Sequence, residues 1–209
     1  FHAEDGIRDP LWSRGLGDVY KRQVLDGIER ARSAGLGVKI NTVLRRGVNE
    51  SQILPLVHWG CEREIPVRFI EYMDVGETNG WRMEQVVRTR EVHDRIAAEF
   101  SMERLNPAHQ GEVARRYRIG AGNREVGFIS SVTEPFCGGC NRLRLSAEGK
   151  LYTCLFAASG FDVRQLIRSG KEETLRLAIQ GIWADRGDRY SERRGARKKH
   201  KVEMSYIGG

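Results

Sequence analysis

The stretch Val67-Arg68-Phe69-Ile70-Glu71-Tyr72-Met73 has the β-branched and aromatic composition of a strand. Residues 38–44, Val-Lys-Ile-Asn-Thr-Val-Leu, have the same character. Apolar residues at helical spacing precede each strand, from Val24 to a stop at Gly35 and again from Asn49 onward. This helix–strand–helix–strand order predicts parallel strands covered by helices, as in an α/β barrel. The chain contains too few strands for a complete barrel, so we expect only part of one.

The remaining elements follow from local patterns. Asn49 and Gln52 predict a capping box, and Pro55 is expected to delay or bend the helix that follows it. Downstream, the patterns predict a helix over 89–100, strands over 112–119 and 125–132 joined by the turn 120–123, a hairpin over 145–153, and helices over 162–169 and 172–183. The last helix should bury Leu175, Ala178, Ile179, Ile182 and Trp183.

Polar residues interrupt the two apolar strands. They are Lys39 and Asn41 in the first strand, and Arg68 and Glu71 in the second. Any one of them could be a satisfied structural group. Four on two adjacent strands favour a functional site, because barrel enzymes place their sites at the ends of strands.

The composition is that of an ordinary soluble globular protein, with 209 residues, 40% hydrophobic and 30% charged. No apolar run is long enough for a membrane span or a signal peptide. The net charge of +7 is concentrated in residues 189–201, so the rest of the chain is close to neutral. This distribution argues against a nucleic-acid-binding face over the whole domain. The basic run itself is either a solvated linker or a phosphate-attracting segment.

Three of the four cysteines form the pattern C-x2-C-x13-C at Cys137, Cys140 and Cys154, whereas Cys61 is predicted to be a small buried apolar residue. A hairpin with the loop 147–149 would set Leu145 opposite Leu151, and Arg142 opposite Cys154. Since strand side chains alternate between faces, one face should carry Cys140, Arg142, Arg144 and Cys154, and the other should turn Leu143, Leu145, Leu151 and Thr153 toward a core.

Two kinds of metal centre suit these thiols. A structural zinc ion needs a fourth ligand, which would come from Cys61, His58, His93 or His109. An iron–sulfur cluster on three thiolates would leave one iron free for a substrate atom. A redox C-x-x-C pair is a weaker explanation, because it does not account for the third cysteine on the same face.

Several motifs occur together and in order. They are Lys39–Asn41, Arg68–Gly76, Asn79–Trp81, Phe128–Val132, Pro135 through Ala157, and the terminal Gly208-Gly209. From Val24 onward the chain closely resembles the GTP 3′,8-cyclases, the radical-SAM enzymes of the first step of molybdenum cofactor biosynthesis. The resemblance is specific because several long motifs agree at once.

The resemblance implies a lyase with two 4Fe–4S clusters. The N-terminal cluster cleaves S-adenosylmethionine to give a radical that abstracts the 3′ hydrogen of GTP, and the resulting carbon radical attacks C8 of the guanine. The C-terminal cluster binds the guanine through its open iron. The implied fold is the C-terminal part of an incomplete radical-SAM barrel, residues 24–76, followed by an α+β iron–sulfur and GTP-binding domain, residues 77–188, and a basic segment with a Gly-Gly tail, residues 189–209.

Site residues carry over only where the motifs match. The implied ligands of the second cluster are Cys137, Cys140 and Cys154. The implied GTP contacts are Arg142, Leu143, Arg144 and Lys39, with Asn41 as a neighbouring candidate, and those to S-adenosylmethionine are Met73 and Arg68. The terminal Gly208 and Gly209 would enter the active site, where glycine fits best because a side chain would collide.

The implied partners are GTP, S-adenosylmethionine, a reductant, the cyclic pyranopterin monophosphate synthase of the next step, and a second copy in a homodimer. No membrane or nucleic acid is implied, and the expected location is cytoplasmic.

One departure from the family matters most. The N-terminal C-x3-C-x2-C motif, which holds the radical-generating cluster, is absent from this sequence. Residues 1–23 resemble a translated sequencing adapter, so we expect them to lie outside the native fold. The expectation is a truncated chain that cannot cleave S-adenosylmethionine.

Two alternatives remain open. The chain could be a zinc-stabilised binding module whose basic run contacts nucleic acid. Alternatively, a partial barrel with exposed strand edges could simply aggregate.

Overall fold

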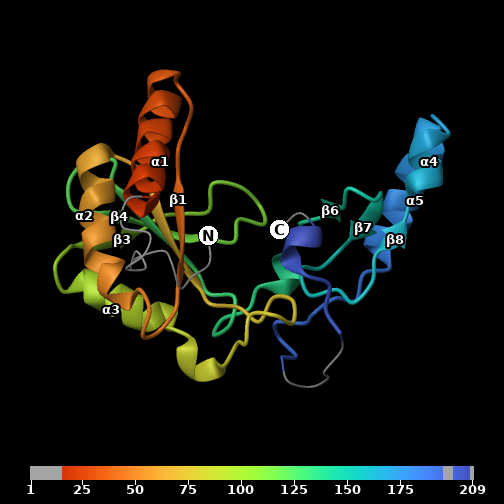
Figure 1. Cartoon of the computed structure of the whole chain (residues 1–209). Helices are drawn as coiled ribbons and strands as arrows, with labels where there is room; N and C mark the ends of the chain where they lie inside the picture. The colour runs from red at the N-terminus through yellow and green to blue at the C-terminus, as the bar shows by residue number, and fades with distance from the viewer. Residues whose placement is uncertain (1–15, 195–199, 208–209) are drawn as a thin grey trace. The chain divides into compact units, whose positions relative to one another are not determined.

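The computed structural model describes residues 16–194 and 200–207, which divide into two compact units (Figure 1). Unit 1 contains the described residues up to Tyr72 together with Met83–Thr133. Unit 2 contains Met73–Arg82 and the described residues from Glu134 onward. This division does not coincide with the predicted boundary after residue 76. A strand near residue 127 returns to pair beside the 67–71 strand, and this pairing draws Met83–Thr133 into the first unit.

Unit 1 is built on a five-stranded sheet of order β1-β2-β5-β4-β3. Its parallel strands are β1 (Ile40–Leu44), β2 (Val67–Glu71) and β5 (Glu125–Ile129). Two antiparallel strands complete it, β4 (Arg115–Ile119) and the unpredicted β3 (Met102–Arg104). The mixed α/β fold class is confirmed.

Two helices, α2 and α3, pack on one face of this sheet, and a third, α1, lies beside α2. Their bounds are α1 (Leu16–Ser33), α2 (Ile53–Arg63) and α3 (Thr89–Ala97), with the short 3-10 helices η1 (Glu50–Gln52) and η2 (Met83–Gln85). The core forms where α2 and α3 pack on the sheet, and it contains Leu44, Ile53, Val57, Val67, Phe69, Val87, Val92, Ile96, Ile119, Val126 and Phe128. α1 lies beside α2 in Figure 1, and an ion pair joins Glu29 to Arg63. Within the described residues, no helix is long and apolar enough to cross a membrane.

Two local expectations need correction. The first helix begins at Leu16 rather than at Val24, so residues 16–23 are helical; no glycine or proline occurs between 18 and 26 to stop the helix. The capping box is also wrong, because the Asn49 side chain bonds to the segment that ends β1. It donates to the Val43 carbonyl at 2.8 Å and accepts from the Arg45 N–H at 2.8 Å.

Pro55 lies in the first turn of α2, which begins at Ile53. A missing N–H costs little in a first turn, because the first four N–H groups of a helix have no intrahelical partner. The delayed helix start that Pro55 predicted is confirmed, since residues 50–52 form the short helix η1 instead.

Unit 2 contains a small antiparallel sheet of order β6-β7-β8. Its elements are η3 (Cys137–Gly139), β6 (Arg144–Leu145), β7 (Lys150–Tyr152), β8 (Phe161–Asp162), α4 (Arg164–Arg168), α5 (Glu172–Ala184) and η4 (Met204–Tyr206). The predicted hairpin is confirmed: Leu145 pairs with Leu151, and Gly149 has φ +77°.

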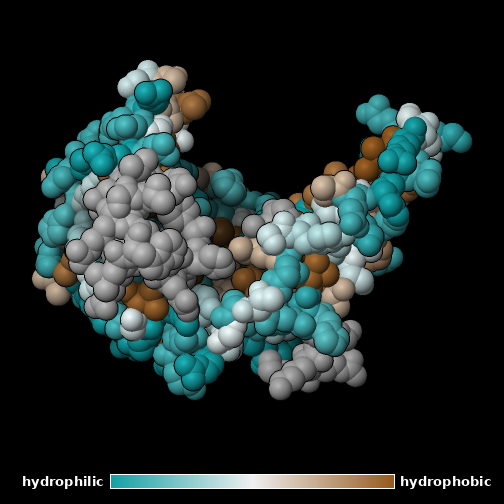
Figure 2. All heavy atoms as spheres, in the orientation of Figure 1, coloured by the Kyte–Doolittle hydropathy of each residue, from teal (hydrophilic) through white to brown (hydrophobic). Residues whose placement is uncertain are grey.

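The apolar side chains of unit 2 are less covered than the sequence predicts. Leu143 and Leu145 are 37% and 53% exposed, although Leu151 and Thr153 are buried as expected. No residue of α5 is buried, and the residues predicted to be its core face are only partly covered. Strands of two or three residues offer too little surface to cover a helix of 13 residues. Figure 2 shows the resulting apolar atoms near α4 and α5.

Candidate functional site

The three clustered cysteines all belong to unit 2, and all are free thiols. Cys137 begins η3, Cys140 follows that turn, and Cys154 lies two residues after β7. The N–H of Phe156 lies 3.5 Å from the Cys154 sulfur. All three cysteine residues are partly exposed.

Arg142 and burial set the ionisation of the thiols. The Nε and Nη2 atoms of Arg142 each lie 3.4 Å from the Cys140 sulfur. Burial alone would raise the pKa of Cys140, but the hydrogen bonds and the charge of Arg142 outweigh it and lower this pKa. Burial raises the pKa of Cys154, and the nearby Asp188 carboxylate and the other two thiols reinforce that shift. The pKa values of the two thiols are therefore shifted in opposite directions.

Arg144 is the half-buried cation of the site. Burial lowers its pKa, and the neighbouring Arg142 guanidinium lowers it further, while Cys140 and Cys154 act in the opposite direction. The Arg142 guanidinium also stacks over the Phe136 ring at 5.1 Å. Two arginines close enough to repel each other favour a bound anion, because the anion would relieve that repulsion. Leu143, between them in sequence, is exposed.

The donor chemistry suits a soft metal or an iron–sulfur group, since it combines three thiols with two adjacent cations that would offset thiolate charge. Within residues 16–194 and 200–207, however, no three His, Cys, Asp or Glu side chains are arranged so that they could hold a metal ion. The thiols are the right chemical type for such a group, but they are not arranged around a single metal position. The histidines considered as zinc ligands, His58, His93 and His109, all belong to unit 1.

Sequence reasoning missed Arg186, whose hydrogen bonds stabilise the turn from Cys137 to Cys140. Its Nη1 donates to the Cys140 carbonyl at 2.7 Å, its Nη2 lies 3.5 Å from the Cys137 carbonyl, and its guanidinium stacks over Trp183 at 4.3 Å. Nothing local marks this residue, because it is 46 positions from Cys140.

The other predicted residues fall into two groups. Lys39, Asn41 and Arg68 belong to unit 1, where Asn41 pairs with Arg68 across β1 and β2 and both face away from the helix-covered core. Arg68 lies against Gly127, where an added Cβ would be 3.1 Å from the Arg68 Cγ. Met73 belongs to unit 2, and its carbonyl accepts from the Asn79 amide at 3.0 Å. Gly208 and Gly209 lie outside the described residues.

Glu71 is not part of a polar site face. It is 2% exposed and points to the helix-covered side of the sheet, opposite to Arg68. Its carboxylate accepts from the Thr89 N–H at 2.9 Å and from the Val132 and Thr133 N–H groups at 2.8 Å each. Its role is to tie β2 to the start of α3 and to the segment after β5. The sequence-based assignment of Glu71 to a site is therefore wrong.

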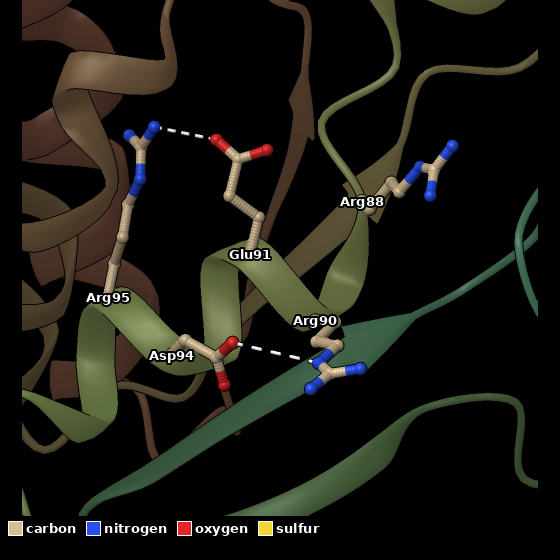
Figure 3. Close-up of a pocket in the computed structure, with 5 residues that line it drawn as sticks. All are labelled: Arg88, Arg90, Glu91, Asp94 and Arg95. Carbon is tan, nitrogen blue, oxygen red and sulfur yellow. Dashed lines mark hydrogen bonds and ion pairs between the residues drawn. The ribbon is translucent and has the colours of Figure 1, made fainter.

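The surface pocket of Figure 3 is a separate feature. It is lined by Arg88, Arg90, Glu91, Asp94 and Arg95, which belong to α3 or directly precede it. Ion pairs join Arg95 to Glu91 at 2.6 Å and Arg90 to Asp94 at 3.9 Å. None of the predicted site residues lines it, so we assign it no function.

Comparison with known proteins identifies the family. Residues 65–192, which include the three cysteines and both site arginines, match the family model described as Molybdenum Cofactor Synthesis C. The chain belongs to this family.

Three curated relatives of this Molybdenum Cofactor Synthesis C chain are named GTP 3′,8-cyclase. The protein from Synechococcus sp. (strain WH7803) is 46% identical over 92% of this chain and 57% of its own length. The protein from Xanthomonas axonopodis pv. citri is 46% identical over 98% of this chain and 62% of its own length, and that from Staphylococcus aureus (strain MRSA252) is 41% identical over 98% and 63%. This chain therefore spans about three fifths of the length of these relatives.

The thiol pKa shifts of this Molybdenum Cofactor Synthesis C chain make a direct prediction. In the reduced, metal-free chain at about pH 8, iodoacetamide should modify Cys140 faster than Cys154, because the thiolate is the nucleophile and a lower pKa supplies more of it. Arg142→Ala should raise the Cys140 pKa and slow its modification. Mass spectrometry of quenched samples measures both rates. Arg164→Ala, which removes an exposed arginine of the same unit, is the control, and equal Cys140 rates in wild type and Arg142→Ala would contradict the assignment.

Proposed function

We propose that this chain is the C-terminal, substrate-binding part of a GTP 3′,8-cyclase, which converts GTP to 3′,8-cyclo-7,8-dihydro-GTP in molybdenum cofactor biosynthesis. The observation that carries the proposal is the gathering of three free thiols and two arginines in unit 2, inside the matched family region. Support also comes from relatives at 41–47% identity that are named for this activity.

In this proposal Cys137, Cys140 and Cys154 would hold a 4Fe–4S cluster. Three thiolate ligands leave one iron able to bind the guanine base of GTP, which is the chemistry that the cluster supplies when bound. Arg142 favours the thiolate form of Cys140 by direct contact with its sulfur. Arg186 holds the backbone carbonyls of Cys137 and Cys140, so the turn keeps its shape independently of the ligand.

The arginines would bind the triphosphate. Arg144 on β6 and Arg142 just before it carry fixed positive charge, and a guanidinium donates two parallel hydrogen bonds to phosphate oxygens. We propose Lys39 as a further contact to GTP, with Asn41 beside it. Met73 and Arg68 are the proposed contacts to S-adenosylmethionine. The reductant, the enzyme of the next step, a homodimer and a cytoplasmic location belong to the same proposal.

Abstraction of the 3′ hydrogen and attack on C8 require a second, radical-generating cluster, for which the C-x3-C-x2-C motif is absent from these 209 residues. We therefore propose that the chain binds substrate but does not turn it over alone.

Anaerobic reconstitution with Fe²⁺ and sulfide tests the cluster. The chain should take up about four irons, and Cys140→Ala should abolish the uptake, because every thiolate of a three-cysteine site is needed. Cys61→Ala is the matched control, since Cys61 belongs to unit 1 and packs against its core. Stoichiometric zinc without an iron chromophore would refute the cluster.

Calorimetric titration of the reconstituted chain with GTP tests the arginines. Arg142→Ala and Arg144→Ala should each weaken GTP binding about tenfold or more, because a charge-assisted contact to phosphate is worth about 1.5–3 kcal/mol. Arg164→Ala, which removes an exposed arginine paired with Asp162, should leave the affinity unchanged. Equal affinities in all three variants would exclude Arg142 and Arg144 from the GTP site.

The nucleic-acid alternative finds less support. Within the described part of the basic run, Arg189 pairs with Glu192, and Arg194 and Lys201 both pair with Asp74. These three cations are engaged inside unit 2, which leaves less charge for phosphate binding.

A further inference from the structure

Asp74 stands at the centre of a charged junction in unit 2. The residue is 9% exposed, and three groups from the C-terminal segment reach its carboxylate. The Tyr190 hydroxyl donates to Oδ2 at 2.5 Å, Lys201 Nζ donates to Oδ2 at 2.8 Å, and Arg194 forms an ion pair with Oδ1. Lys201 Nζ also donates to the Asp74 carbonyl at 2.6 Å.

Aromatic rings line the same junction. The rings of Phe156 and Tyr190 stack with centroids 4.5 Å apart. Lys201 Nζ lies 4.7 Å from the Tyr190 centroid, and the Arg194 guanidinium lies 5.5 Å from that of Phe156 and 5.4 Å from that of Trp81. A cation over an aromatic face is attracted to it, more strongly when water is excluded. The side chains of Asp74, Arg194 and Lys201 are only 12–13% exposed, so water screens these contacts weakly.

A second set of contacts extends the junction. Glu203 accepts from the Glu77 N–H at 2.8 Å and from the Thr78 hydroxyl at 3.3 Å. Gly76 makes this approach possible, because its φ is +63° and an added Cβ would lie 2.1 Å from Glu203 Oε2. The segment 200–203 is therefore fastened to the segment 74–78 along its length.

The junction is connected by direct contacts to Cys154, the third of the clustered cysteines. Phe156, whose ring stacks on Tyr190, is the residue whose N–H faces the Cys154 sulfur. The Val202 N–H donates to the Ala157 carbonyl at 3.1 Å, and the Thr153 hydroxyl donates to Asp188. Thr153 and Ala157, on either side of Cys154, are thus both bonded to the C-terminal part of the chain, in which Ile207 is fully buried.

We propose that Asp74 is a positioning residue that anchors the C-terminal segments 188–194 and 200–207 against the loop around Cys154, residues 153–157. It neutralises two cations that would otherwise repel each other in a confined space, and it thereby holds Tyr190, Phe156 and Lys201 in one arrangement. The proposal deepens the proposed function, since Cys154 is a proposed cluster ligand there. It is tested on the metal-free chain, so its failure is distinct from a failure of cluster or GTP binding.

Hydrogen exchange measured by mass spectrometry tests the anchor on the full chain. Asp74→Asn keeps the side-chain volume but removes the charge, and it should speed amide exchange in 188–194 and 200–207 by about tenfold or more, because local opening no longer has to break the junction. Lys201→Met should give the same local pattern. Asp162→Asn, which removes an exposed carboxylate of the same unit, should leave both segments unchanged.

A second readout separates anchoring from a general structural role. In Asp74→Asn, iodoacetamide should modify Cys154 several times faster, while the rate at Cys140 stays as in wild type, since Arg186 and Arg142 still hold that turn. Unchanged exchange in 188–194 and 200–207 would overturn the proposal. The proposal would also be overturned if amide exchange became equally faster over the whole unit, α5 included. It would likewise be overturned if the modification rates of Cys140 and Cys154 rose equally.

Discussion

Replacement of Glu71 by glutamine should lower the free energy of unfolding of unit 1 by about 3 kcal/mol, because hydrogen bonds to a buried charged group are worth about 1.5–3 kcal/mol each and a glutamine cannot keep all of them. Oε2 accepts the N–H groups of Val132 and Thr133. Oε1 accepts the Thr89 N–H and the hydroxyls of Thr89 and Thr133.

A glutamine fits best with its oxygen in place of Oε2 and its NH₂ in place of Oε1. The two threonine hydroxyls could then turn to accept, but the buried Thr89 N–H would be left facing another donor. The chain of donors behind it would also be disturbed, because Arg115 donates to Ser130 at 2.7 Å and Ser130 donates to Thr89 at 2.8 Å.

Urea denaturation followed by circular dichroism measures the loss in Glu71→Gln. Glu103→Gln is the matched control: it removes an exposed carboxylate, paired with Arg118 in the same sheet, and it should change stability by less than about 1 kcal/mol. Equal stabilities of the two variants would show that the Glu71 network contributes little.

Replacement of Gly60 by alanine should destabilise unit 1 by about 2–3 kcal/mol, although alanine is the better helix former. Gly60 is buried in α2, and an added Cβ would lie 2.6 Å from Val67 Cγ2 and 2.8 Å from the Ile65 carbonyl oxygen. The backbone oxygen cannot turn aside as a side chain could. The helix would therefore have to move away from β2.

Gly27→Ala is the control, and its effect on stability should have the opposite sign. Gly27 lies in α1 with nothing within 4 Å of an added Cβ, so alanine there should raise stability by up to about 1 kcal/mol. Thermal melts of the two variants measure the difference. A stabilising effect of Gly60→Ala would contradict the close packing of α2 on β2.

The contrast between these two glycines shows why the fold was only partly predictable. Both occur in helical patterns, and sequence alone gives no reason to separate them. The difference arises from what lies opposite each residue. The same holds for Glu71, whose strand was predicted from composition but whose face was decided by the position of α3.

The same distinction, between what local sequence predicts and what only packing decides, applies to the candidate site. The cysteine spacing, the two arginines and the hairpin register could be predicted, because they lie within eighteen residues of sequence and follow from strand alternation and turn chemistry. Arg186 and Asp74 could not. Their partners lie 46 residues away at Cys140 and 127 residues away at Lys201.

The sequence by itself determined the strands β1 and β2, the helix α3, the hairpin and the grouping of three thiols with two guanidinium groups, because each depends on the local periodicity of side chains. Only the tertiary structure decided that β5 returns beside β2, that Glu71 joins elements rather than a site, and that the C-terminal segment is fastened to Asp74. The physical reason is that these contacts join groups far apart in the chain. Their formation depends on how whole elements pack, and no local pattern of residues records it.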